Sequence, residues 1–136
     1  MKKALVLFLG LAFCISAGCS KSSGNSGKDA ILELTKISNN AAAKIKDAKN
    51  EKEAVQIVNE YAEKAQVFAD RLKELDKANP KWADKDPSVK EAATNLGTAI
   101  KAYIEASLPV LMNYAESKEI SAAGEKLQKA IGDFLK

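Results

Sequence analysis

The chain contains no histidine and only two cysteines among its 136 residues, and aromatic side chains make up 6% of it. Without histidine there is no histidine-assisted nucleophile, no histidine zinc site and no histidine-ligated haem. Two cysteines are too few for a metal site built from thiolates. Seven glycines and three prolines are too few for a turn-rich β protein or a low-complexity chain. We therefore predict no catalytic residue, no metal and no cofactor.

The first twenty residues have the layout of an export signal. Lys2 and Lys3 precede an almost unbroken apolar run over residues 4–15, and small residues follow up to Cys19. A basic start, a short apolar stretch and a small-residue exit are typical of a secretory signal peptide. The run is too short to cross a bilayer, which takes about 20 apolar residues. We predict a signal peptide over residues 1–18 and an exported protein.

The exit sequence Ser-Ala-Gly-Cys, ending at Cys19, resembles the lipobox of bacterial lipoproteins, in which small residues precede a cysteine that becomes acylated. That family prefers Leu three residues before the cysteine, where this chain has Ser16, with Ile15 one position further back; relaxed lipoboxes of some bacteria are similar. The resemblance implies a diacylglycerol on Cys19, often with a third acyl chain, and two or more chains anchor a protein stably. A serine directly after the cysteine, here Ser20, is similar to the pattern of lipoproteins that are passed on to the outer membrane. The resemblance therefore implies that the protein lies at the outer membrane, on its periplasmic or surface face.

Two other outcomes for this region remain open. Ordinary cleavage after Gly18 or nearby would leave a soluble secreted protein. Cys14 is a second candidate acceptor, although bulky Phe13 precedes it.

The segment after Cys19 is rich in Ser, Gly and Asn and has nothing to bury. Such a composition is typical of a flexible linker, so we expect residues 19–28 to be a tether and residues 29–136 to be the folded domain. Residues 1–18 hold two lysines and no acid, which leaves 19 basic against 18 acidic residues, a net charge of +1. A charge this small gives no drive toward nucleic acid, and we predict none as a partner.

Apolar residues recur at steps of three and four over four segments, residues 29–48, 50–79, 86–114 and 120–136. This spacing is typical of amphipathic helices. In the second segment the steps alternate without error as a heptad, carried by Ala54, Val58, Tyr61, Ala65, Phe68, Leu72 and Leu75. The sequence predicts an all-α fold, an antiparallel four-helix bundle in up-down-up-down order.

Two features interrupt the helical pattern in the second half of the chain. Pro109 lies inside the third segment, and because proline cannot donate to the carbonyl of Glu105, we expect a kink at residues 105–108. The apolar phase changes after Tyr114, which predicts a break at residues 116–119. We expect the main core contributors to be Phe68, Leu72, Leu96, Ile100, Leu127 and Ile131.

Apart from Cys19, the candidate binding residues are aromatic. Tyr61, Tyr103 and Tyr114 lie on or beside the apolar stripes, where they either line a cavity for a small apolar ligand or pack in the core with the hydroxyl at a wet edge. Trp82 lies in the polar break between Pro80 and Pro87. An exposed Trp often marks a contact with a partner, and the alternative is that Trp82 folds back and caps the bundle.

The sequence therefore predicts a bacterial lipoprotein of the cell envelope, anchored in a membrane through Cys19. We expect it to act as a non-catalytic binding module for another protein or a host molecule, through exposed helix faces or the segment around Trp82. Two alternatives remain open. One is a carrier of a small apolar ligand inside the bundle, and the other is an envelope-structural protein that self-associates through the heptad face of residues 50–79. We expect a monomer or weak self-association.

Overall fold

The computed structural model describes residues 23–132, and this range is all-helical. Residues 1–22, which include the predicted signal peptide and Cys19, lie outside the described residues, as do residues 133–136. The described elements are α1 (Ser23–Lys46), α2 (Glu51–Ala78), the 3-10 helix η1 (Trp82–Lys85), α3 (Pro87–Met112) and α4 (Lys118–Gly132). The predicted four-helix bundle is confirmed.

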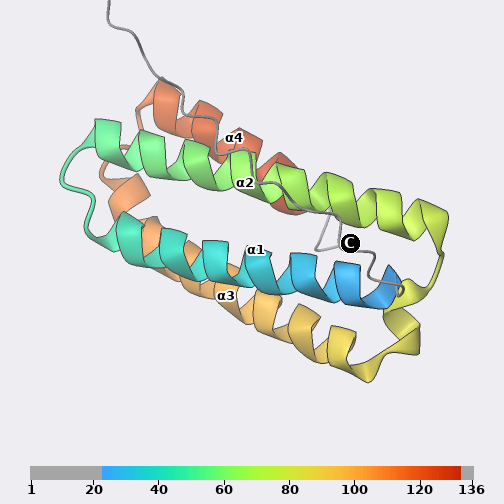
Figure 1. Cartoon of the computed structure of the whole chain (residues 1–136). Helices are drawn as coiled ribbons and strands as arrows, with labels where there is room; N and C mark the ends of the chain where they lie inside the picture. The colour runs from blue at the N-terminus through green and yellow to red at the C-terminus, as the bar shows by residue number, and fades with distance from the viewer. Residues whose placement is uncertain (1–22, 133–136) are drawn as a thin grey trace, which may run out of the picture.

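The direction of the helices alternates along the chain, as an up-down-up-down bundle requires (Figure 1). The most closely packed pairs are α1 with α3 and α2 with α4, and α1 also packs on α2. Because one helix intervenes along the chain between the members of each close pair, those members run parallel (Figure 1). Buried alanines at seven-residue intervals, Ala92, Ala99 and Ala106, give α3 a flank of small side chains, which permits close helix approach.

Local capping signals set the start of α2 and of α3. The Asn50 side chain accepts a hydrogen bond from the Glu53 backbone N–H at 2.9 Å, and Glu53 Oε2 accepts one from the Lys49 backbone N–H at 2.9 Å. Asp86 accepts from the Ser88 backbone N–H at 2.8 Å and precedes Pro87, the first residue of α3. These contacts satisfy backbone donors that lack a partner within the helix.

The predicted break between the third and fourth helices is confirmed. Helix α3 ends at Met112, α4 begins at Lys118, and the Ser117 hydroxyl accepts from the Ile120 backbone N–H at 3.2 Å. Pro109 lies inside α3, three residues before its end. The kink at residues 105–108 stays a prediction.

Part of the segment that was expected to be a tether is helical, because α1 begins at Ser23 and includes residues 23–28. Gly27 lies close to other parts of the bundle: an added Cβ would lie 2.6 Å from Leu75 Cδ2 and closer still to the Trp82 ring. Glycine therefore leaves room for the indole against α1, a packing role that its Ser/Gly-rich surroundings conceal in the sequence.

The core agrees with the predicted stripes except in the second half of α2. Leu96, Ile100, Leu127 and Ile131 are buried as expected, whereas Phe68 and Leu72 are only partly buried. Helix α4 has 15 residues and α2 has 28, which correspond to about 22 Å and 42 Å at 1.5 Å per residue. Because both start at the same end of the bundle, the described part of α4 covers only about the first half of α2 (Figure 1).

The first half of the α2 heptad face is turned into the bundle. Ala54, Val58, Tyr61 and Ala65 are each no more than 1% exposed. This part of the face is occupied by the other helices of the same chain, and self-association through it is therefore not compatible with the fold.

Candidate functional site

Two tyrosines meet at the centre of the bundle. Tyr61 of α2 and Tyr103 of α3 are 1% and 2% exposed. Their ring centroids are 4.6 Å apart with an interplanar angle of 62°, an edge-to-face contact that is favourable for aromatic rings. These rings are the largest fully buried side chains of the described residues, and they fill the space that a ligand cavity would need.

The hydroxyl groups of the two tyrosines differ in their partners. Ser38 Oγ donates to the Leu34 carbonyl at 2.8 Å. Since a serine hydroxyl has one hydrogen, the Tyr61 hydroxyl is the donor in its 2.7 Å bond with Ser38 Oγ. The buried Tyr103 hydroxyl has no hydrogen-bond partner among the described residues.

Burial controls the ionisation of both hydroxyls. It raises the pKa of Tyr61 above 10.0, and the bond that Ser38 can donate to the ionised Tyr61 oxygen opposes this effect to a smaller extent. It also raises the pKa of Tyr103, and the neighbouring Tyr61 adds to this effect. Both side chains are therefore neutral at physiological pH.

Tyr114 lies apart from this pair. It is partly buried in the turn after α3 and lines a hollow that it shares with Glu51, Met112 and Glu116. The three tyrosines thus occupy different surroundings, and the burial of Tyr61 and Tyr103 favours the alternative in which they pack in the core. Periodicity correctly placed Tyr61 and Tyr103 on inward faces, but it could not show that the two rings contact each other.

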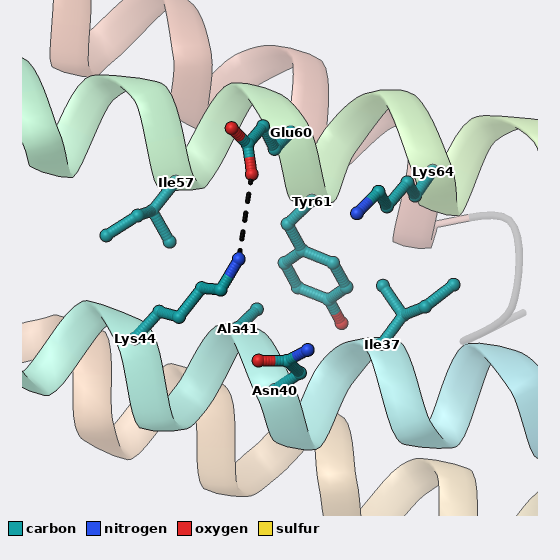
Figure 2. A pocket seen from close by; sticks show the side chains of 8 residues that line it. All are labelled: Ile37, Asn40, Ala41, Lys44, Ile57, Glu60, Tyr61 and Lys64. Atoms are coloured by element: carbon teal, nitrogen blue, oxygen red, sulfur yellow. Dashed lines mark ion pairs between the residues drawn. The ribbon is translucent and has the colours of Figure 1, made fainter. Parts of the chain in front are cut away.

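A groove lies on the surface between α1 and α2 (Figure 2). Both helices contribute residues at the same spacing of three, one and three, so that each presents one face to the groove. The lining residues are Ile37, Asn40, Ala41 and Lys44 of α1 and Ile57, Glu60, Tyr61 and Lys64 of α2. Its volume of about 40 Å³ is close to that of one water molecule, about 30 Å³, so this part of the groove does not enclose a larger ligand.

The two walls of the groove are bridged by an ion pair. Lys44 Nζ lies 3.9 Å from Glu60 Oε2, and the two side chains are 52% and 41% exposed. Exposed pairs of this kind contribute about 0–1 kcal/mol, so the pair can open at little cost when a partner offers other charges.

The groove continues toward the turn between α1 and α2. A second hollow of about 310 Å³ shares Lys44, Ile57 and Glu60 with the first and adds Asp47, Ala48, Glu53 and Gln56. We call the whole feature, residues 37–48 and 53–64, the α1–α2 groove. Partly exposed apolar side chains run along it with charges of both signs at its edges, an arrangement suited to contact with a protein surface.

Trp82 does not have the exposure that a contact residue needs. It is only 7% exposed, at the start of η1, and its ring packs over Gly27. Of the two alternatives for Trp82, its burial favours the one in which the indole caps one end of the bundle.

The range 23–132 holds no cluster of three or more His, Cys, Asp or Glu side chains placed to bind a metal ion. None of its helices combines the length and the apolar character that crossing a membrane requires.

Comparison with known proteins gave no matching family model, no similar curated protein and no similar solved structure.

Proposed function

We propose that this chain is a bacterial lipoprotein of the cell envelope, anchored through acyl chains on Cys19, whose bundle contacts another protein through the α1–α2 groove. The observation that carries the proposal is the amino-terminal sequence, in which two lysines, an apolar run and small residues lead to Cys19. The proposed role is non-catalytic binding. The expected location is the outer membrane, with the bundle on its periplasmic or surface face.

The start of α1 supports a short connection between anchor and bundle. Ser23 is the first described helical residue, and it follows Cys19 by four positions. Four residues extend at most about 14 Å, so the amino-terminal end of α1 would stay near the bilayer. The part of the α1–α2 groove that lies on α1, residues 37–46, is about 21–35 Å along the helix from Ser23. The groove thus begins about 21 Å along α1 from the end that is connected to the anchor.

The chemistry of the groove favours a protein as the partner. Ile37, Ala48 and Ile57 supply apolar contact area, and Lys44 and Glu60 supply charges of opposite sign at its edge. An apolar centre with a polar rim is the usual anatomy of a protein–protein contact. The net charge of +1 for residues 19–136 adds no general attraction for nucleic acid or anionic lipid.

Acylation is tested by labelling cells with a fatty acid that carries a detectable tag. The full chain should take up the label and partition into the detergent phase, and Cys19→Ser should lose both properties. Cys14→Ser is the matched control, because it changes the other cysteine, and it should remain labelled. Label that persists in Cys19→Ser and disappears in Cys14→Ser would contradict the assignment of the anchor.

The groove is tested by placing a photo-crosslinking amino acid at Lys44 of the full chain in intact cells. An adduct with another envelope protein is expected at this position. The same group at Lys90, an exposed position on α3, is the control and should give no such adduct. Equal adducts at both positions, or none at Lys44, would exclude the groove as the contact surface.

A further inference from the structure

Helix α3 presents a stripe of apolar side chains to solvent. Ile104 is 50% exposed, Leu108 is 57% exposed and Met112 is 67% exposed. Steps of four place these residues one above another on the helix surface. Single exposed apolar residues are common in soluble proteins, but a continuous group of them is typical of a contact surface. We call Ile104, Leu108 and Met112 the α3 stripe.

The fold explains why the stripe is left uncovered. Successive residues of a helix are turned by about 100° around its axis. Viewed along α3, the flank of buried alanines, Ala92, Ala99 and Ala106, therefore lies on one side of Tyr103, and Ile104 lies on the other side. That flank is buried, in keeping with the close packing of α3 on α1, whereas α4 packs mainly on α2. The apolar surface of α3 is thus wider than the part of it that the bundle buries.

We propose that the α3 stripe is a contact between two copies of this chain, packed antiparallel about a two-fold axis near Leu108. In this register Leu108 lies on Leu108 of the second copy, and Ile104 lies against Met112 of the second copy. A two-fold contact uses the same patch on both copies, so one stripe is sufficient for the whole interface. The unbranched Met112 side chain can adapt to the β-branched Ile104.

The charges at the two ends of the stripe are complementary in this orientation. Lys101 lies seven residues before Leu108, and Glu116 lies eight residues after it. Glu116 and Glu51 line a hollow of about 580 Å³ beside Met112. An antiparallel second copy brings its Lys101 to this pair of carboxylates, and the same contact is repeated at the other end. A parallel arrangement would place like charges together.

Lys101 is able to make this exchange. Within its own helix it lies 3.8 Å from Glu105, and both side chains are more than two-thirds exposed. Such a pair is weak in water, so a second ion pair across an interface can replace it. The same surroundings argue against a lipid surface as the occupant, because the stripe contains no aromatic residue and only one cation lies beside it.

The size of the stripe predicts a weak dimer. Three side chains supply less area than the roughly 1,200–2,000 Å² of a standard stable interface. Confinement of two chains to one membrane would raise their effective concentration and favour the contact. The contact itself rests on α3 and is independent of acylation and of the α1–α2 groove.

The test is a photo-crosslinking amino acid at position 108 of the full chain, used in cells and on protein purified in mild detergent. An adduct with twice the mass of the chain is expected. Val67 is the matched control position, because it is apolar, 64% exposed and located on α2, and it should give no dimer adduct. An adduct with lipid alone, an adduct with a different protein alone, or no adduct at position 108 would overturn the proposal.

A charge exchange tests the antiparallel register. With the crosslinker at position 108, Lys101→Glu should lower the yield of dimer by about fivefold. Adding Glu116→Lys to that variant should restore the yield, which simple misfolding would not do. Failure of the double variant to recover would contradict the register. Dimer formation by purified Cys19→Ser at high concentration would show that the contact holds even if the anchor is assigned wrongly.

Discussion

At the scale of single residues, the buried tyrosine pair has the clearest energetic consequences. Tyr61 donates to Ser38, whereas the Tyr103 hydroxyl is buried with no partner among the described residues. A buried polar group without a hydrogen bond costs about 1–3 kcal/mol. The two hydroxyls therefore contribute to the stability of the bundle with opposite signs.

Removing each hydroxyl should reveal this difference. We predict that Tyr103→Phe raises the free energy of unfolding by about 1 kcal/mol or more, because it deletes an unsatisfied group. Tyr61→Phe, the matched control, should lower it by about 0.5–1.5 kcal/mol through loss of the bond to Ser38. Denaturant titration measures both values, and destabilisation by Tyr103→Phe would show that its hydroxyl has a partner.

The same pair predicts a loss of stability in alkali. The pKa values of Tyr61 and Tyr103 are raised in the folded state, whereas an unfolded tyrosine has a pKa of about 10.0. Above that pH the unfolded chain loses protons that the folded chain keeps, so the free energy of unfolding falls as pH rises. Below it, the two tyrosines cause no pH dependence. Unfolding free energies measured from pH 8 to pH 11 should show this fall, and Tyr103→Phe should make it shallower; equal slopes would contradict the burial of Tyr103.

At the scale of the elements, the junction between α1 and η1 depends on one missing side chain. Gly27 gives the Trp82 ring its place against α1. Any Cβ at this position must displace the indole or Leu75. The addition of a single methyl group at Gly27 therefore disturbs the packing at this end of the bundle.

We predict that Gly27→Ala lowers the free energy of unfolding by about 1–3 kcal/mol through overpacking. The emission of Trp82, the only tryptophan, should shift to the red as the indole becomes more exposed. Gly97→Ala is the matched control, since an added Cβ there meets nothing within 4 Å, and it should stabilise α3 by about 0.5–1 kcal/mol. Unchanged emission in Gly27→Ala would contradict the contact.

The uneven cover of α2 gives a further prediction for its side chains. Leu34 is 0% exposed, whereas Leu72 is partly buried beyond the described part of α4. Leu34→Ala should lower the free energy of unfolding by about 2–5 kcal/mol, and Leu72→Ala should lower it by clearly less. Thermal or denaturant unfolding compares the two variants, and equal losses would show that α2 is covered along its whole length.

At the scale of the whole molecule, much of the architecture followed from local signals. The recurrence of apolar residues over residues 50–79 and 86–114 is a short-range pattern, and it predicted helices α2 and α3 well. The role of Gly27 could not be predicted, because it depends on Trp82, which is distant in sequence. Its Ser/Gly-rich neighbours are equally typical of a linker.

The candidate sites were less predictable than the helices. Periodicity shows which side of a helix is apolar, but not how much of that side a neighbouring helix covers. Ile104, for example, follows the buried Tyr103 directly in an apolar segment and is half exposed. The α1–α2 groove depends on the register of two helices, which brings Lys44 to Glu60 and which no local pattern specifies.

The proposed function of the whole molecule depends on what happens at its amino terminus. The most direct test is the mass of the amino-terminal peptide from native chain purified out of its own membrane. We expect this peptide to begin at Cys19 and to carry the added mass of a diacylglycerol. A peptide that begins at another residue, or one that begins at Cys19 without acyl groups, would show that Cys19 is not the membrane anchor.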